Sequence, residues 1–345
     1  RQNPKLSKQE FQSINEIDRG AFTVTTGHQL MVCGGSAFFE VKIASTIALA
    51  KTLSADLHHP VIPVFWMASE DHDFEEIASF EINGHIFTWK QELLGGPVGR
   101  MPTLDLASQL ETFIAQIEMN DAQRALLLGR IEAYKSEPDL SSATRRIVRE
   151  WAMGLGVLVL DGDDVQLKEF AAHLWDKELR GELGKEIKSQ TIKLQDAGYK
   201  AQVFPREVNL FSLENDLRTR IDRPNHKVSP VNTSPNALLR PIFQEYVLPN
   251  LAYIGGGGEL AYWLQLSSTF DMLEITMPVL YLRDSLLCVP LKIDRKVRQE
   301  DLTWTEVMNS SKETMLKDKL GYYSSLSLET IELSKPLLSS IDQWN

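Results

Sequence analysis

Residues 60–76 have the sequence PVIPVFWMASEDHDFEE, in which a short apolar run is followed at once by a dense acidic cluster. The apolar part, residues 60–67, predicts a buried strand of a parallel sheet. The acidic part, residues 70–76, holds five carboxylates and one imidazole in seven positions. Like charges this close cost stability unless a cation, a proton or a substrate relieves them. Because ligands bind at the carboxyl ends of strands in open α/β sheets, this junction is a candidate functional site.

Composition sets the broad class. The chain has 345 residues, enough for about two domains of ~100–200 residues each. Its 36 Lys and Arg against 47 Asp and Glu give a net charge of −11, which disfavours a nucleic-acid surface. The two cysteines, Cys33 and Cys288, form no disulfide framework and fit a reducing cytoplasm. No apolar stretch is long enough for a membrane span and no signal peptide is recognised, so we expect a cytoplasmic protein with no membrane partner.

A strand–loop–helix–strand unit opens the chain. Residues 22–26 are rich in β-formers and stop at Gly27, and a glycine-containing loop, residues 27–36, leads into a helix. That helix carries Phe39, Ile43 and Ile47 on one face. With the strand at residues 60–67, this pattern predicts an α/β fold with a Rossmann-like, doubly wound parallel sheet.

Further along, helical and strand patterns alternate and suggest insertions into that core. We predict the following division: 1–105, first half of the Rossmann-like core; 106–156, helical insertion; 157–200, core strand and one long helix; 201–234, small β-rich insertion; 235–292, second half of the core; 293–345, helical C-terminal segment.

The loop after the first strand is the second candidate site. Backbone N–H groups of a glycine loop before a helix can hold an anion, but the loop has neither GxGxxG nor GxxxxGK[ST]. A tight turn is about as good an interpretation as a phosphate cradle. His28 favours the cradle, since a histidine there can donate to a phosphate oxygen. The candidates are Thr26, Gly27, His28, Gln29, Gly34 and Gly35.

For the acidic cluster, the plainer interpretation is a solvated helix N-terminus, which the helix dipole favours. This explains Asp71 and Asp73 but explains less well a histidine, His72, between them. No second group of His or Cys stands at ligand spacing nearby, so no metal-ligand set is evident. The candidates are Glu70, Asp71, His72 and Asp73.

Two more segments carry candidates. The run Gly255–Gly258 is either a flexible hinge or a place where a ligand approaches the backbone, and the aromatic residues after it favour a ligand. Arg240 offers a planar fork for a carboxylate or phosphate, or else pairs with Glu245 or another acid.

Together these segments resemble the cysteine-adding enzyme family of bacillithiol biosynthesis, BshC. The resemblance runs from about residue 22 to residue 292, and its most specific motif is EDHDFEE at residues 70–76. The other matching positions are Thr26-Gly27-His28-Gln29, Pro63-Val64-Phe65-Trp66, Leu239-Arg240-Pro241 with Gln244, and Leu251-Ala252-Tyr253 with Gly255, Gly256, Gly258, Glu259, Tyr262, Trp263 and Leu266.

The resemblance implies a Rossmann-type core with connecting-peptide insertions and a C-terminal helical coiled coil that forms a homodimer. It also implies a ligase that joins cysteine to glucosaminyl-malate in the last step of bacillithiol synthesis. ATP is the expected activator, and the nucleotide can bring Mg²⁺ with it. The resemblance also relates the core to class I aminoacyl-tRNA synthetases. The chain has no literal HIGH or KMSKS motif, so it lacks the usual adenylation residues of those enzymes. We expect much of the coiled coil to lie outside this sequence.

On this hypothesis His28 and three residues of the acidic cluster, Asp71, His72 and Asp73, are catalytic. His28 would stabilise charge at the α-phosphate, the Glu70–Asp73 cluster would bind an amino group and take its proton, and Arg240 would grip a malate carboxylate. The expected nucleotide- and substrate-binding residues are Thr26, Gly27, Gln29, Gly34, Gly35, Glu70, Arg240, Gln244, Gly255, Gly256, Gly258, Glu259, Tyr262 and Trp263.

Two other functions stay open at this point. One is a metal-dependent hydrolase of a glycoside or amide, with Asp71, His72 and Asp73 as ligands. The other is a non-catalytic, dimeric protein that binds a sugar acid.

Overall fold

A five-stranded parallel sheet forms the centre of the protein. The computed structural model describes residues 6–92, 95–311 and 314. The strands are β1 (Phe22–His28), β2 (Val61–Met67), β5 (Leu158–Asp161), β9 (Asn250–Gly255) and β10 (Val279–Leu282), in the order β10-β9-β1-β2-β5. Every neighbouring pair runs parallel. The predicted α/β class and doubly wound parallel sheet are confirmed.

Strand β2 is buried along its whole length. Because successive side chains of a strand point to opposite faces, its apolar residues enter two separate cores. Phe65 packs edge-on against Phe39 at 5.3 Å between ring centroids, in the core on one face. Trp66 packs against Phe243 at 5.3 Å in the core on the other face. A strand covered on both faces explains why residues 61–67 form a continuous apolar run rather than an alternating one.

The strand order reverses at β1. The chain proceeds from β1 through β2 to β5 on one side, and later returns to place β9 and then β10 on the other side. The crevice outside the carboxyl ends of β1 and β9 is therefore the topological switch point, where open α/β sheets bind their ligands.

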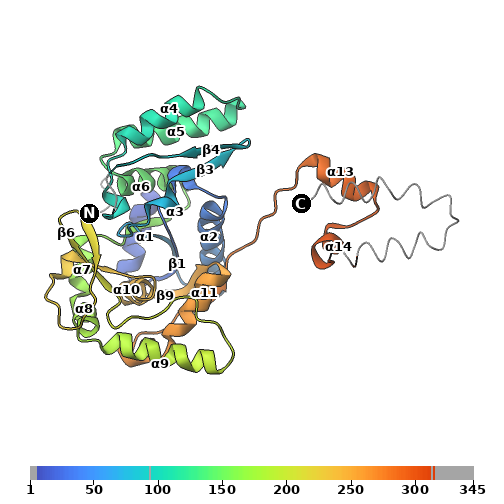
Figure 1. Cartoon of the computed structure of the whole chain (residues 1–345). Coiled ribbons are helices and arrows are strands. Elements are labelled where there is room, and N and C mark those ends of the chain that lie inside the picture. The colour runs from blue at the N-terminus through green and yellow to red at the C-terminus, as the bar shows by residue number, and fades with distance from the viewer. Residues whose placement is uncertain (1–5, 93–94, 312–313, 315–345) are drawn as a thin grey trace. The chain divides into compact units, whose positions relative to one another are not determined.

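Two additions flank this sheet. An antiparallel hairpin, β3 (Ser79–Ile82) and β4 (His85–Thr88), lies above the sheet in Figure 1, together with helices α4 (Leu104–Ile114) and α5 (Asp121–Ser136). A second addition, the β-subdomain (residues 201–235), contains the antiparallel sheet β7-β6-β8. Its strands are β6 (Leu210–Glu214), β7 (Leu217–Arg220) and β8 (Thr233–Pro235).

The described helices are α1 (Lys8–Asp18), α2 (Phe38–Leu57), α3 (Phe74–Ile77), α4 (Leu104–Ile114), α5 (Asp121–Ser136), α6 (Leu140–Trp151), α7 (Val165–Phe170), α8 (Ala172–Leu179), α9 (Glu182–Asp196), α10 (Leu239–Val247), α11 (Gly257–Trp263), α12 (Ser267–Leu273), α13 (Leu291–Gln299) and α14 (Trp304–Asn309). The N-terminal helix α1 begins with a capping box between Ser7 and Glu10.

The prediction of one long helix within residues 157–200 is wrong. The structure has three helices there, α7, α8 and α9, separated at Ala171 and at Arg180–Gly181. Gly181 has φ +75°, a left-handed conformation that ends a helix and lets the next one start in a new direction. Charge and helical periodicity continue across both breaks, so the pattern alone did not reveal them.

The chain divides into two compact units, residues 1–285 and 286–345, and each is described by itself. In the second unit, α13 and α14 are described, and residues 315–345 lie outside the described residues. The predicted coiled coil falls largely on those residues, so it stays a prediction, as does the homodimer through C-terminal helices.

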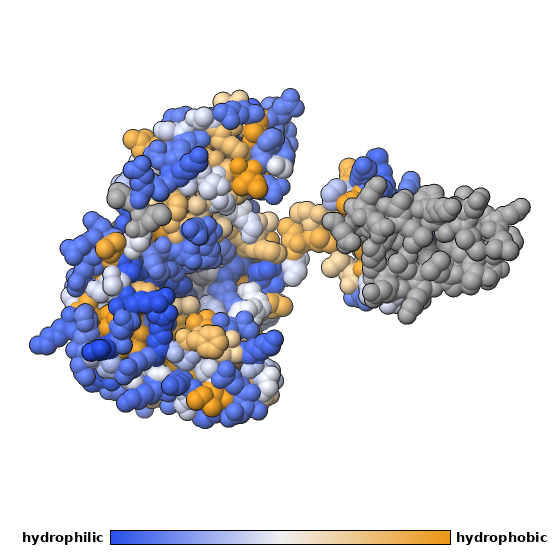
Figure 2. Space-filling model, viewed as in Figure 1, coloured by the Kyte–Doolittle hydropathy of each residue, from blue (hydrophilic) through white to orange (hydrophobic). Residues whose placement is uncertain are grey.

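The visible face of the first unit is mostly hydrophilic, with hydrophobic residues between (Figure 2). Among the described residues, no helix combines the length and the apolar character needed to cross a membrane.

Two helical glycines test the packing of the additions. A Cβ at Gly184 of α9 would lie 2.6 Å from the backbone oxygen of Glu207, whereas a Cβ at Gly129 of α5 meets nothing within 4 Å. We expect Gly184→Ala to destabilise the protein by about 1–3 kcal/mol, because the backbone of Glu207 would have to move away from the new Cβ. Gly129→Ala should stabilise it by about 0.5–1 kcal/mol through helix propensity. Urea unfolding of both variants checks this, and a stabilised Gly184→Ala would contradict the packing described.

Candidate functional site

A polar cavity lies at the switch point. Its volume is about 260 Å³. We call it the switch-point cavity; its walls come from the ends of β1, β2 and β9 and from α2, α3, α10 and α11. The lining residues are Gly27, His28, Gln29, Lys42, Ala68, Glu76, Arg240, Pro241, Gln244, Tyr253, Glu259, Tyr262 and Trp263.

Lys42, which is buried, and Glu259, which is partly exposed, form an ion pair in the wall. Lys42 Nζ donates to Glu259 Oε2 at 2.7 Å and to the backbone oxygen of Gly27 at 2.5 Å. Glu259 also accepts from the Tyr253 hydroxyl and from the backbone N–H of Gly256 at 3.1 Å. One carboxylate therefore joins α11 to α2 and β9. Lys42 is not among the residues predicted from sequence, although a lysine on the apolar face of its helix was a visible signal.

His28 lies at the carboxyl end of β1, with Phe39 edge-on to its ring at 5.3 Å. Burial, together with the positive charge of Lys42, lowers the pKa of His28 to about 4. The ring is therefore neutral near pH 7. Its Nδ1 lies 3.0 Å from the backbone oxygen of Gln29. A carbonyl only accepts, so Nδ1 carries the hydrogen and Nε2 is left as an acceptor.

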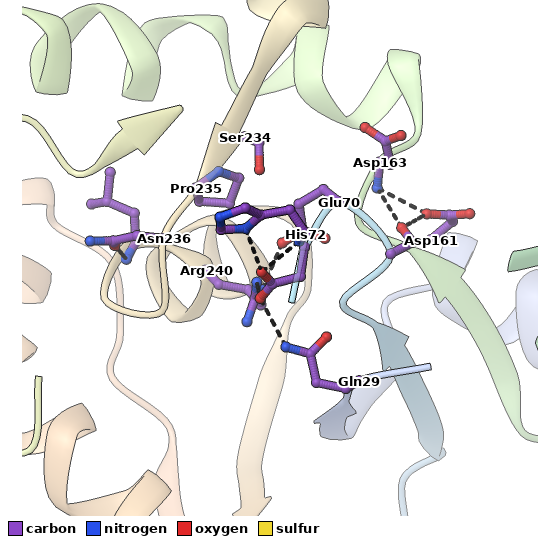
Figure 3. A network of polar contacts seen from close by, with 12 residues as sticks. Gln29, Glu70, His72, Asp161, Asp163, Ser234, Pro235, Asn236 and Arg240 are labelled. Atoms are coloured by element: carbon purple, nitrogen blue, oxygen red, sulfur yellow. Dashed lines mark hydrogen bonds and ion pairs between the residues drawn. The ribbon is translucent and has the colours of Figure 1, made fainter. Parts of the chain in front are cut away.

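Two carboxylates of the acidic cluster, those of Glu70 and Asp71, are paired with arginines from distant parts of the chain. Figure 3 shows Arg240 and Glu70 of this network. Arg240 donates from Nε to Glu70 Oε1 at 2.7 Å and from Nη2 to Asp71 Oδ2 at 3.0 Å. Arg218 of the β-subdomain donates from Nη1 to Asp71 Oδ1 at 2.9 Å. Arg240 thus pairs with acids, one of the two interpretations left open, and its partners are Glu70 and Asp71 rather than Glu245.

Asp71 is the centre of this network. Gln29 Nε2 also donates to Asp71 Oδ2, at 2.8 Å. Burial alone would raise the pKa of Asp71, but the Arg240 and Arg218 guanidinium groups outweigh it and hold that pKa well below its usual range. Paired charges thus stabilise Glu70 and Asp71, and Asp71 is ionised at any physiological pH. Arg218, 147 residues from Asp71 in sequence, carried no signal that could have identified it.

His72 and Asp73 have different surroundings. His72 Nδ1 lies 2.8 Å from Arg218 Nη1 and its side chain is partly exposed. Asp73 is exposed and caps α3, accepting from the backbone N–H of Glu76 at 3.3 Å. The plainer interpretation of a helix N-terminus therefore describes the position of Asp73.

Other residues predicted to lie in the site make contacts within the fold. Thr26 is buried and donates to the backbone oxygen of Ile254 at 2.8 Å, across the β1–β9 pair. Gly34 and Gly35 do not line the switch-point cavity; both have positive φ, and a Cβ at Gly35 would meet Met31. Gly34 and Gly35 therefore lie in a tight turn, and a phosphate contact at these glycines stays a prediction.

The glycine run forms the end of β9 and the start of α11. Gly255 ends β9, and Gly256 N–H reaches Glu259 as the helix begins, while Gly258 lies in open space. Trp263 stacks on Tyr253 at 4.1 Å between centroids, and Tyr262 lines the cavity beside it. Gln244 also lines the cavity, and its Nε2 donates to Glu245 at 2.8 Å.

The three residues considered as ligands of a hydrolytic metal, Asp71, His72 and Asp73, already make other contacts. Both oxygens of Asp71 accept from arginines, Nδ1 of His72 faces Arg218, and Asp73 caps a helix. Within the described part of the chain, no three His, Cys, Asp or Glu side chains are grouped so that they could hold a metal ion.

The ion network predicts different effects on stability for the same Asp→Asn substitution at two positions. Asp71→Asn removes the shared partner of two largely buried arginines, so we expect a loss of about 3–5 kcal/mol in the free energy of unfolding. Asp73→Asn should change it by less than about 0.5 kcal/mol, since Asn caps a helix as well as Asp. Repulsion within the cluster alone would have given Asp71→Asn the opposite sign. Denaturant unfolding decides, and an Asp71→Asn variant as stable as the parent would contradict the network.

Comparison with known proteins relates this geometry to a family. The family model for the N-terminal Rossmann-like domain of the bacillithiol biosynthesis protein BshC matches residues 1–284. That span contains the whole parallel sheet, the β-subdomain and every residue of the switch-point cavity.

Curated relatives of the chain carry the name of the same family. Proteins named "Putative cysteine ligase BshC" in Flavobacterium johnsoniae and Flavobacterium psychrophilum are 38% and 36% identical, over 89% and 90% of this chain. One from Lysinibacillus sphaericus is 27% identical over 88% of the chain. The chain spans 62% of the length of each of these relatives. With its whole core matched by the family model and with these relatives, the chain belongs to the BshC family.

Proposed function

We propose that this protein acts in bacillithiol biosynthesis as a ligase that joins the carboxyl group of cysteine to the amino group of glucosaminyl-malate. The observation that supports this most is the polar cavity at the switch point of a BshC-family core. The relatives' names support cysteine as a substrate and ligation as the reaction. The low cysteine content, which fits a reducing compartment, supports a reaction in the cytoplasm as part of this proposal.

The size of the cavity limits what it holds. Ligand pockets for drug-sized molecules usually measure ~300–1,000 Å³, and this one measures about 260 Å³. It suits a whole amino acid or one end of a larger substrate. We assign it to the malate end of the acceptor or to cysteine, with the remainder of the reactants outside it.

Arg240 favours the malate end. Its Nε and Nη2 are fixed by Glu70 and Asp71, and its Nη1 makes no hydrogen bond to the described residues. The guanidinium is thus oriented by two acids and can donate from its outer end to a carboxylate. Amide formation consumes the carboxylate of cysteine but keeps both carboxylates of malate, so a lasting carboxylate clamp fits malate. Since Glu70 and Asp71 balance the charge of Arg240, geometry rather than net charge supplies the recognition.

His28 supports a role different from the one expected at a phosphate. Because its free nitrogen, Nε2, accepts rather than donates, it suits an N–H of the attacking amine better than a phosphate oxygen. With a pKa of about 4 the ring is a weak base near pH 7, so we assign it to orienting the amine and not to removing its proton.

ATP as activator remains part of the proposal on chemical grounds. A carboxylate and an ammonium group do not condense in water unless the carboxyl is activated. The loop expected to hold phosphates does not line the cavity at Gly34 and Gly35, so we assign the nucleotide no residue there. Mg²⁺ would arrive with the nucleotide.

The assay of the proposed function uses the purified protein with cysteine, glucosaminyl-malate and ATP. We expect a thiol product with the mass of the amide, formed only when all three are present. His28→Asn should reduce the rate at least tenfold, because the amine loses the Nε2 acceptor. A slower rate in this variant also shows that the product does not come from a contaminating enzyme. Absence of product from a folded protein would contradict the ligase.

The same variant has a stability signature. The folded-state pKa of His28, about 4, is below the ordinary value of 6.5, so the unfolded chain binds a proton first as pH falls. The parent should therefore be fully stabilised above pH 6.5 and lose stability between pH 6.5 and 4. His28→Asn should lose less across that window. Equal losses would show that His28 is not buried as described.

Arg240→Lys tests the carboxylate clamp. Lysine cannot reproduce a fork that holds two acids and still donates outward, so malate should bind at least tenfold more weakly. Arg220→Lys, an exposed position on β7, is the matched control and should bind malate like the parent. Isothermal calorimetry measures both, with a melting curve to confirm that each is folded. Unchanged malate affinity in Arg240→Lys would remove Arg240 from the site.

A further inference from the structure

Arg218 reaches the candidate site from outside the Rossmann core. It lies on β7 of the β-subdomain, and its side chain is only 3% exposed. Within the subdomain it donates from Nε to Ser234 Oγ at 2.9 Å and from Nη2 to the backbone oxygen of Pro235 at 2.8 Å. Its guanidinium carbon also lies 3.9 Å above the Phe211 ring. These contacts fix the plane of the guanidinium and leave Nη1 to face the core.

Nη1 contacts two predicted site residues at once. It lies 2.9 Å from Asp71 Oδ1 and 2.8 Å from His72 Nδ1. A guanidinium has donors only, so Nδ1 of His72 must accept and a neutral ring carries its hydrogen on Nε2. The alternative, an Nδ1–H donated to Asp71 Oδ1, has a longer contact of 3.3 Å. That oxygen already accepts from Arg218 and from the His72 backbone N–H at 2.8 Å.

The two oxygens of Asp71 are divided between two groups of residues. Arg218 and the His72 backbone N–H donate to Oδ1, and Oδ2 accepts from Arg240 and Gln29, which both line the switch-point cavity. Holding Oδ1 therefore sets the rotation of the carboxylate that orients Arg240. Without Arg218, Asp71 could rotate and the cavity wall would lose its alignment.

We propose that Arg218 is a positioning residue of this site: it sets the His72 tautomer and, through Asp71, the orientation of Arg240. The β-subdomain then has a function beyond covering the core, since it supplies the guanidinium that aligns two segments of the Rossmann core. The tautomer does not depend on the proposed ligase activity, whereas the effect on malate binding rests on it.

The test begins with the unmodified full chain. Nitrogen-15 spectra of histidine-labelled protein near pH 8, where histidine rings are neutral, report which ring nitrogen carries hydrogen, and His72→Gln identifies the signal. We expect the hydrogen of His72 on Nε2. A hydrogen on Nδ1 would overturn the proposal without any variant, so the test does not depend on the folding of a mutant.

Two variants complete the test. Arg218→Gln should give a mixture of His72 tautomers and weaken malate binding at least fivefold, while Arg220→Gln on the same strand should change neither. A folded Arg218→Gln protein that keeps the Nε2–H tautomer would overturn the positioning role. If the parent chain binds no malate at all, the proposed function fails while the tautomer result still decides the role of Arg218 at His72.

Discussion

The carboxylate of Asp71 is the interaction on which the site depends. It follows the end of β2, and it accepts from Gln29 after β1, Arg240 on α10 and Arg218 on β7. Two guanidinium groups and one carboxylate are costly to bury unless their geometry is satisfied, and here each oxygen of Asp71 has at least two donors. Removing this one group would leave two arginines without their shared partner.

This network defines one wall of the switch-point cavity, and the Lys42–Glu259 pair defines another. Both walls use opposite charges held by different elements, so their alignment requires the whole sheet to be assembled. His28 also lines the cavity, and its lowered pKa keeps it neutral near Lys42. The cavity therefore contains charged and neutral groups whose hydrogen-bonding directions are fixed before a ligand enters, which is how binding sites reduce the cost of ordering.

Several parts of this site could be read from residue order. The apolar run ending at Met67 and the acidic segment after it predicted a strand end with a site, and both lie where expected. The segments around His28, Arg240 and Tyr262 were selected, and all three residues line the cavity. Residue order does not reveal that a Cβ at Gly34 or Gly35 would approach Phe39 or Met31, and the anion cradle proposed for these glycines stays a prediction.

The sequence by itself determined the parallel sheet, since buried strands need continuous apolar runs, and it determined the family through motifs such as EDHDFEE. Tertiary structure alone decided how charge is balanced. Arg218 is 147 residues from Asp71, and no periodicity links them, so their 2.9 Å contact follows only from the packing of the β-subdomain. The same holds for Lys42 and Glu259, which are 217 residues apart. Whether an acidic cluster repels itself or is neutralised depends on distances in space, and these exist only once the sheet is assembled.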